Sequence, residues 1–214
     1  MSDAPRTDKS FDGLIRQMGR DITELQRRLG ASAGPGLTLL RPDPTTLVNA
    51  TLEGDGTIIL NSVNDDFCLI PGVFATGYKS YMAVYSIGGT GAANSAIFRY
   101  MQGATVVSTS AAYGNSRYYV TTAGAFSGSY LASSYGQLGA VESTMGVDGS
   151  FQVFDPVNPA TRTSSTFDSV AGGLRGSGGT LMAAAESYDG IAFQRGPVGG
   201  AKTTTGWVKL YGYR

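Results

Sequence analysis

Apolar residues recur with spacings of four and three between residues 11 and 29, which is the spacing of a heptad seam. Ser10 is a suitable N-cap before this stretch, and Gly30 follows it where a helix would end. An isolated helix of this length is marginal in water, so the stripe needs partner helices. We therefore predict that residues 1–30 form a coiled coil that joins copies of the chain; the alternative is a helix that lies on its own domain. The seam residues are Phe11, Ile15, Met18, Ile22, Leu25 and Leu29.

Residues 31–50 have a different character. The stretch ASAGPG has the composition of a linker, and Pro42 and Pro44 exclude a continuous helix or a central strand. We expect this segment to be an extended neck between the helix and the rest of the chain.

From residue 51 onward, polar and apolar positions alternate with a period of two in short runs separated by Gly, Asn, Asp and Ser. Tyr81, Ala83, Tyr85 and Ile87, for example, would share one face of a strand. Residues 51–214 are therefore predicted to form one antiparallel β-sandwich. Candidate strands cover residues 57–63, 67–71, 80–87, 96–101, 104–109, 117–122, 150–154, 191–195 and 207–213.

Short glycine-containing sequences predict turns and a loop between these strands. The dipeptides Asp55-Gly56, Asp148-Gly149 and Asp189-Gly190 each precede a strand-like run and predict turns. The stretch GGLRGSGG at 172–179 is predicted to be a flexible connector or a surface loop.

The amino-acid composition limits the classes of binding partner that we expect. Lys plus Arg equals Asp plus Glu at 16 each, which gives no electrostatic reason to expect nucleic acid as a partner. The sequence shows no signal peptide and no long apolar run, so neither classical secretion nor membrane insertion is expected. Cys68 is the single cysteine, and its apolar neighbours predict a buried thiol.

Candidate catalytic chemistry is sparse. The chain contains no histidine, which excludes Ser-His-Asp, Cys-His and His-based zinc mechanisms, and it has no phosphate-binding or nucleophile-elbow motif. Scattered acids occur mostly in turn contexts, so we predict no enzyme activity, no metal site and no cofactor. The acids considered are Asp65, Asp66, Glu142, Asp148, Asp155, Asp168, Glu186 and Asp189.

Residues 110–139 combine several tyrosines with Ser, Gly and Asn, a texture typical of binding loops. The same composition fits ordinary aromatic-rich strands, in which Tyr118 and Tyr119 would point to opposite faces. Both interpretations stay open. The residues chosen as candidate ligand contacts are Tyr113, Asn115, Arg117, Tyr118, Tyr130 and Tyr135.

Both ends of the chain carry a resemblance. FDGLIRQMGRDITELQRRL, together with YDGIAFQRGPVGGAKTTTGWVKLYGYR, resembles the N-terminal helix and the closing hairpin of minor tail or receptor-binding proteins of long-tailed bacteriophages of Gram-positive actinobacteria. The resemblance implies a jelly-roll-like sandwich, a homotrimer at the tail tip of the virion, attachment to other tail or baseplate proteins through the N-terminus, and a host cell-wall saccharide as ligand. Synthesis in the host bacterial cytoplasm follows from the same resemblance.

The expected function is therefore non-catalytic adsorption to a host surface polymer through several weak sites linked by oligomerisation. One alternative is a head fibre, capsid decoration or collar protein without receptor activity. Another is a carboxylate-dependent glycan-degrading enzyme.

Overall fold

The computed structural model describes residues 36–64, 66–90, 95–121, 126–140, 146–172, 174–196 and 202–214. The chain divides into units 1–37 and 38–214. The predicted coiled coil over residues 1–30, with all six of its seam residues, lies outside the described residues and stays a prediction. Of the predicted neck, residues 38–50 belong to the second unit.

The described part of the chain is mainly β, its strands pair antiparallel, and it contains no helix, hence none that could cross a membrane. The strands are β1 (Leu37–Leu39), β2 (Ala50–Leu52), β3 (Ile58–Ser62), β4 (Cys68–Ile70), β5 (Ser80–Gly88), β6 (Ser95–Gln102), β7 (Thr105–Val106), β8 (Tyr113–Thr121), β9 (Phe126–Ser133), β10 (Gly136–Ala140), β11 (Val147–Phe154), β12 (Ser164–Ala171), β13 (Leu174–Met182), β14 (Gly190–Gly196) and β15 (Thr204–Tyr213).

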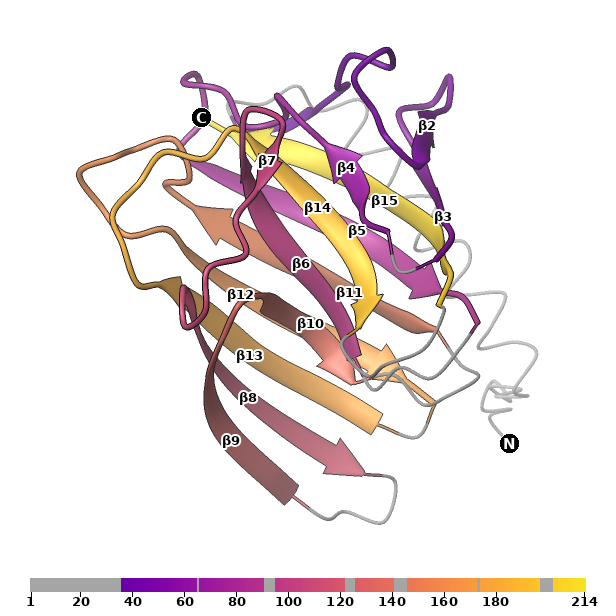
Figure 1. Cartoon of the computed structure of the whole chain (residues 1–214), viewed down its shortest axis with the longest axis vertical. Coiled ribbons are helices and arrows are strands. Elements are labelled where there is room, and N and C mark those ends of the chain that lie inside the picture. The colour runs from indigo at the N-terminus through magenta and orange to yellow at the C-terminus, as the bar shows by residue number, and fades with distance from the viewer. Residues whose placement is uncertain are drawn as a thin grey trace, which may run out of the picture. The chain divides into compact units, whose positions relative to one another are not determined.

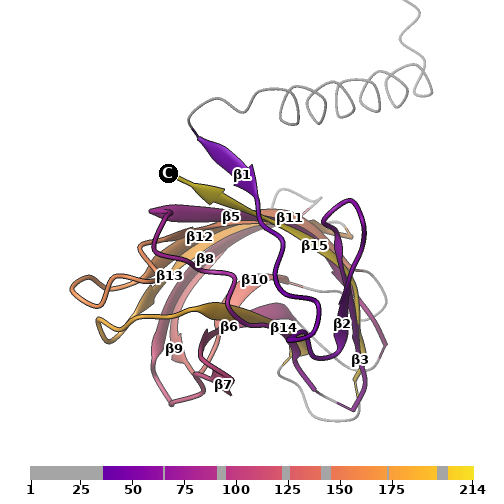
Figure 2. The same ribbon diagram turned by 90° about the horizontal axis from the view of Figure 1, so that it is seen from above.

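The strands form two sheets that pack face to face (Figures 1 and 2). The large sheet has the order β2-β3-β15-β5-β11-β12-β13-β8-β9, with β1 paired to β15. The small sheet has the order β10-β6-β14-β4, with β7 paired to β6. One continuous hydrophobic core fills the space between them, with members such as Ile58, Tyr85, Phe98, Phe151 and Phe193. We call the opposite face of the large sheet the outer face; in the part of the chain that the structure describes, no second sheet packs on it (Figure 2).

The predicted alternation explains which side chains enter this core. On β5, Tyr81, Ala83, Tyr85 and Ile87 share one face, as predicted, and the structure shows that this face is the buried one, while the intervening residues are half-buried on the outer face. On β15, Val208 and Leu210 are buried in the same way. Cys68 is fully buried, and burial raises the pKa of its thiol, which confirms the prediction of a buried cysteine.

The chain passes repeatedly from one sheet to the other. Strands β3, β5, β11 and β15 lie in the large sheet and alternate with β4, β6, β10 and β14 in the small one. Two hairpins interrupt this alternation. Both hairpins extend the same side of the large sheet: the β12–β13 hairpin lies next to β11, and the β8–β9 hairpin lies beyond it, next to β13.

All nine predicted strands overlap observed ones, but the stretch predicted as a loop at 172–179 is wrong over most of its length. Strand β13 begins at Leu174 and lies between β12 and β8. Its glycines are required by close packing, because a Cβ at Gly178 would collide with the Ser116 carbonyl oxygen and lie 2.7 Å from the Phe167 ring. The glycine-rich composition that suggested a flexible loop is therefore required by close packing within a strand.

The three Asp-Gly dipeptides have different outcomes. Gly56 has a φ of 84° in the turn between β2 and β3, where the Asp55 carboxylate accepts a hydrogen bond from the Thr57 N–H, so this turn is confirmed. Asp148-Gly149 lies inside β11, so the predicted turn there is wrong. Asp189-Gly190 leads into β14, but β14 pairs with β4 and β6 rather than with the preceding strand.

Candidate functional site

The tyrosine-rich segment 110–139 forms β8, β9 and β10, and this division separates the six predicted contact residues. Strands β8 and β9 form the edge hairpin of the large sheet, whereas β10 belongs to the small sheet. Alternate residues of β8 point to opposite faces of the sheet. Tyr113, Asn115 and Arg117 therefore face inward, while Tyr118 lies on the outer face with Tyr130.

Tyr113 is part of the core. It is fully buried, its ring stacks on Tyr100 with centroids 6.0 Å apart, and its hydroxyl accepts a hydrogen bond from the Tyr100 N–H at 2.9 Å. The same hydroxyl donates to the Val107 carbonyl oxygen at 3.1 Å. Burial raises the pKa of this hydroxyl. In this position the side chain stabilises the sandwich and does not contact solvent.

Asn115 joins three strands from a buried position. Its Nδ2 donates to the Ser133 hydroxyl at 3.0 Å and to the Tyr135 carbonyl oxygen at 2.9 Å. Its Oδ1 accepts from the Thr180 hydroxyl at 2.8 Å and from the Gln137 N–H at 3.2 Å. The amide is thus fully used inside the protein, and Tyr135 enters this network through its backbone.

Arg117 is half-buried on the inner side of the hairpin. Its Nε donates to the Ser129 hydroxyl at 2.9 Å, and its Nη1 donates to Gln137 Oε1 at 2.5 Å. The guanidinium carbon lies 5.3 Å from the centroid of the Tyr119 ring, within cation–π range. Burial raises the pKa of Tyr119. Arg117 therefore holds the hairpin against the edge strand of the small sheet.

Tyr118 and Tyr130 are the predicted contact residues that the structure leaves exposed, on the same face of the neighbouring strands β8 and β9. Tyr118 is 51% exposed and Tyr130 is 75% exposed. A Cβ at Gly114 would lie 2.7 Å from the Tyr130 hydroxyl, and one at Gly128 would lie 2.9 Å from the Tyr118 ring. The Tyr118 ring thus packs beside Gly128, and the Tyr130 hydroxyl lies beside Gly114. We call Tyr118 and Tyr130 the tyrosine pair.

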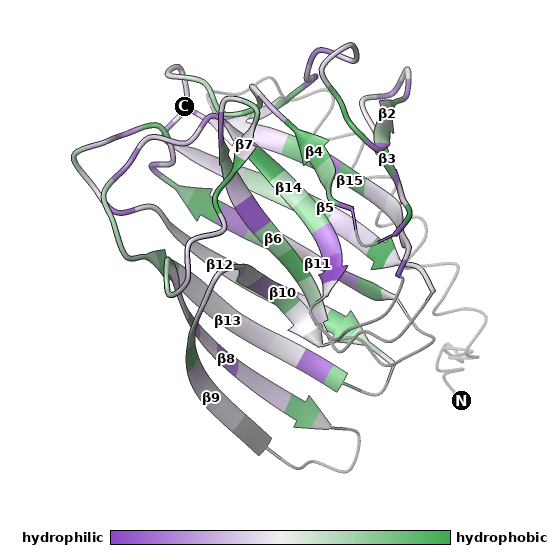
Figure 3. Ribbon diagram, in the orientation of Figure 1, coloured by the Kyte–Doolittle hydropathy of each residue, from purple (hydrophilic) through white to green (hydrophobic). Residues whose placement is uncertain are grey.

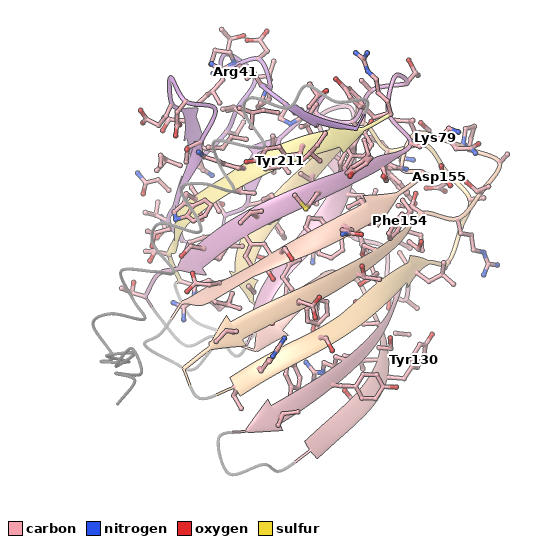
Figure 4. All side chains as sticks on the ribbon, turned by 180° about the vertical axis from the view of Figure 1, so that it is seen from behind. Arg41, Lys79, Tyr130, Phe154, Asp155 and Tyr211 are labelled. Carbon is pink, nitrogen blue, oxygen red and sulfur yellow. The ribbon has the colours of Figure 1, made fainter. Side chains whose placement is uncertain are left out.

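Small polar residues connect the tyrosine pair to the rest of the outer face. Cross-strand pairing places Tyr130 opposite Ser116, then continues through Gly179, Thr166 and Gln152 to Met82 and Tyr211, one residue from each strand from β9 to β15. Figure 4 shows this face, with Tyr130 at one end and Tyr211 at the other. Its polar centre and aromatic ends had no sequence signal beyond the alternation within single strands.

An open hollow of about 290 Å³ lies near the Tyr211 end of the same face. Its lining combines an aromatic side chain, an amide and a hydroxyl, from Tyr213, Gln152 and Ser80, with Met82 and Tyr81 completing it. Sequence reasoning missed this hollow, because its residues come from β5, β11 and β15, which are far apart in the chain.

The candidate carboxylates that the structure describes lie in turns or loops and on the outer face. Asp189 accepts two hydrogen bonds from the Gly103 N–H, at 3.0 and 3.1 Å, and Asp155 has a φ of 51° in a turn. Asp148 and Asp168 are exposed on neighbouring strands of the outer face. The described residues contain no group of three or more His, Cys, Asp and Glu side chains arranged to hold a metal ion. Asp65 and Glu142 lie outside the described residues.

Comparisons of this chain with protein-family models, curated proteins and solved structures find no match.

Proposed function

We propose that this protein is a non-catalytic adsorption protein that binds a saccharide on the outer face of its large sheet. The observation that carries the proposal is the tyrosine pair, two exposed aromatic side chains on the outer face of the edge hairpin. Aromatic planes of this kind offer an apolar surface to a sugar ring at low entropic cost, and nearby hydroxyl and amide groups can bond its hydroxyls. Ser116, Thr166 and Gln152 lie in the same row of the face.

The strand order supports the interpretation of the unit as a jelly roll. Four strands in the order β3-β15-β5-β11 face four in the order β4-β14-β6-β10, which is the arrangement of two four-stranded sheets in a jelly roll. The β8–β9 and β12–β13 hairpins are then insertions. Both extend the same sheet, so they widen the outer face and carry the tyrosine pair at its far edge.

The biological setting of the proposal rests on the resemblance to tail proteins. In that setting the chain is a homotrimeric minor tail or receptor-binding protein at the tip of a phage tail. Its N-terminal helix assembles the trimer and contacts other tail or baseplate proteins, and the sandwich binds a host cell-wall saccharide. Linked weak sites raise avidity by about 10²–10⁴ over a single site, so each face need bind only weakly.

The test compares binding of the full chain and its variants to purified actinobacterial cell walls in a sedimentation assay. Replacement of both tyrosines, Tyr118→Ala with Tyr130→Ala, should reduce binding by at least about tenfold, because stacking of this kind contributes on the order of 1 kcal/mol per ring. The pair Tyr118→Phe and Tyr130→Phe keeps the rings and should retain most of the binding. Val48→Ala, at an exposed apolar residue that bridges to Leu69 of the small sheet, is the matched control.

Three outcomes would contradict parts of the proposal. Equal binding by the wild type and the alanine variant would remove the outer face as the site. Release of reducing sugar from the same cell walls would favour a glycan-degrading enzyme. Labelling of the capsid rather than the tail by antibody would favour a head fibre or decoration protein.

Oligomerisation is tested separately through the predicted seam. The variant Ile15→Asp with Ile22→Asp puts charges into two layers of the predicted coiled coil. We expect light scattering to give a trimer for the wild type and a monomer for the variant, and cell-wall binding to fall with the loss of avidity. A wild-type monomer would contradict the assembly proposed here.

A further inference from the structure

One charged side chain in the sandwich lacks the partners that its burial requires. Arg195 lies near the end of β14, is fully buried, and is the largest fully buried side chain among the described residues. No described residue accepts a hydrogen bond from its Nε, Nη1 or Nη2. Figure 3 shows this hydrophilic end of β14 beside strands with many hydrophobic residues.

An unpaired buried guanidinium is energetically costly. Removing a charge from water has a penalty of several kcal/mol unless acceptors replace the lost hydration. An arginine escapes this penalty poorly because its side chain stays protonated in proteins. Burial lowers the pKa of Arg195, and this is the direction expected for a charge without compensation.

The other arginines near this core have compensation. Arg99 lies 4.8 Å from the centroid of the Phe67 ring and its Nη2 donates to the Ser134 hydroxyl at 3.4 Å, although its Nε lacks a partner, whereas all three nitrogens of Arg195 lack one. Arg117 has Ser129, Gln137 and the Tyr119 ring, as described above. Arg195 thus differs from both.

Neighbouring residues contact the backbone and the aliphatic part of the Arg195 side chain. Its backbone N–H donates to the Thr204 hydroxyl at 3.0 Å. A Cβ at Gly89 would collide with the Thr203 carbonyl oxygen and would lie 3.1 Å from Arg195 Cδ, so only glycine fits there. Gly89 also has a φ of 137°, which glycine adopts without strain. Thr90 and Thr203 bond to each other through their hydroxyls at 3.0 Å.

A second cationic residue is buried near Arg195 in the chain fold. Lys202 is also buried, with 6% of its surface exposed, and it lies two residues before Thr204. The described residues around Arg195 that the contacts identify are glycine and threonine, which bring no negative charge. Two buried cations therefore lie at this end of the sandwich.

We propose that Arg195 is the anchor of an oxyanion-binding site at the end of the sandwich where Gly89, Thr90, Thr203 and Thr204 meet. The fork of a guanidinium matches the two oxygens of a carboxylate or phosphate group, and this pairing is among the strongest hydrogen-bonded contacts in proteins. The anion is either free phosphate or an acidic group carried by a saccharide. The proposal does not depend on the tyrosine pair, which lies on the outer face.

The experiment measures the unfolding temperature of the full chain in an anion-poor buffer and during titration with inorganic phosphate. Wild-type protein should become more stable as phosphate increases, since a ligand that binds the folded state shifts unfolding to higher temperature. Arg195→Met should lose this response and Arg195→Lys should keep a weaker one. Arg175→Met, at an exposed arginine on β13, should respond as the wild type does.

In the anion-poor buffer, the direction in which Arg195→Met changes the unfolding temperature provides a second test. If Arg195 has no partner in the unliganded protein, Arg195→Met removes a buried charge and should leave the unfolding temperature unchanged or raised. If Glu142, the acidic residue of segment 141–145, pairs with Arg195, then Arg195→Met and Glu142→Gln should each lower the unfolding temperature strongly. That result, or a wild type that does not respond to phosphate, would overturn the proposal.

Glucuronate and glucose distinguish the sources of the oxyanion. A response to glucuronate but not to glucose would assign the site to the acidic group of a saccharide. A response to phosphate alone would assign it to a free anion, and both results support an oxyanion site.

Discussion

At the scale of single residues, several of the described glycines have a packing role that the glycine content of the sequence does not reveal. Several lie under aromatic rings: a Cβ at Gly149 would lie 2.7 Å from the Tyr85 hydroxyl, and one at Gly178 would lie 2.7 Å from the Phe167 ring. Glycine is usually unfavourable within a strand. Here its missing side chain lets a ring approach the backbone, so the glycine and the ring act as one packing unit.

Gly149→Ala tests this role. The added methyl would collide with the Asp168 carbonyl oxygen and the Tyr85 hydroxyl, which donates to the Leu138 carbonyl oxygen at 2.6 Å. We expect a loss of about 3 kcal/mol in the free energy of unfolding, at the upper end of the usual cost of overpacking. Urea denaturation measures it. Gly54→Ala is the control, because nothing lies within 4 Å of its Cβ position; equal stabilities for the two variants would contradict the argument.

The sequence of a single strand predicts which residues share a face, but it does not predict which face is exposed or which residues of other strands they contact. The alternation of Tyr118 and Tyr119 predicted that they face opposite ways, and the structure agrees, with Tyr118 exposed and the Tyr119 hydroxyl buried. The sequence did not reveal which face is outside, because that depends on the sheet opposite. Nor did it show that Tyr113 and Asn115 are occupied by internal contacts, since their partners come from other strands.

At the scale of elements, strands with bulky alternating residues were predictable and strands of small polar residues were not. β5 and β15 show a clear period of two. β9 and β13, which are rich in Ser and Gly, resemble loops when read alone, and they become strands because a neighbour supplies hydrogen bonds and rings. The order of the strands in the sheets was not predictable either, because it depends on pairs that are distant in sequence, such as β3 with β15.

Strand β9 also has an element-scale consequence as the edge of the large sheet. Its eight residues, FSGSYLAS, carry no charge and no proline, and Tyr130 and Leu131 are exposed on opposite faces. Edge strands without such protection pair with other chains. We expect sedimentation velocity to show association that increases with concentration, beyond any fixed oligomer.

The variant Leu131→Lys should suppress this association, because a charge on an edge strand opposes pairing. Val63→Lys, at an exposed position after β3, should have no such effect. A sedimentation coefficient that is independent of concentration for the wild type would show that the edge is protected in another way.

At the scale of the whole molecule, buried tyrosines set the response to alkaline pH. Burial raises the pKa of Tyr81, Tyr85, Tyr100 and Tyr113, and burial together with the charge of Glu186 raises the pKa of Tyr188 to about 12. A pKa that is higher in the folded state means that the folded state holds more protons above the ordinary tyrosine value of about 10. Stability contributed by these groups is complete below about pH 10 and falls as the pH rises through 10 toward 12.

We therefore expect the free energy of unfolding to change little between about pH 6 and 8, since the chain has no histidine. It should begin to fall near the ordinary cysteine pKa of about 8.5, because burial raises the pKa of Cys68, and it should decrease steeply above about pH 10. Urea denaturation across this range measures the change. Tyr188→Phe should reduce the steepness of the decrease because it removes one of the shifted groups. A free energy of unfolding that stays constant to pH 12 would contradict the conclusion that buried tyrosines set the response to alkaline pH.

The position of β15 within the large sheet has a consequence for how the protein is made. This strand, residues 204–213, lies between β3 and β5 and pairs with both. During synthesis the earlier strands emerge with the middle of their sheet still missing, and their apolar faces stay uncovered until this segment arrives. Ribosome-bound intermediates should therefore be prone to aggregation and depend on chaperones, and the sandwich should close only after translation has passed residue 213.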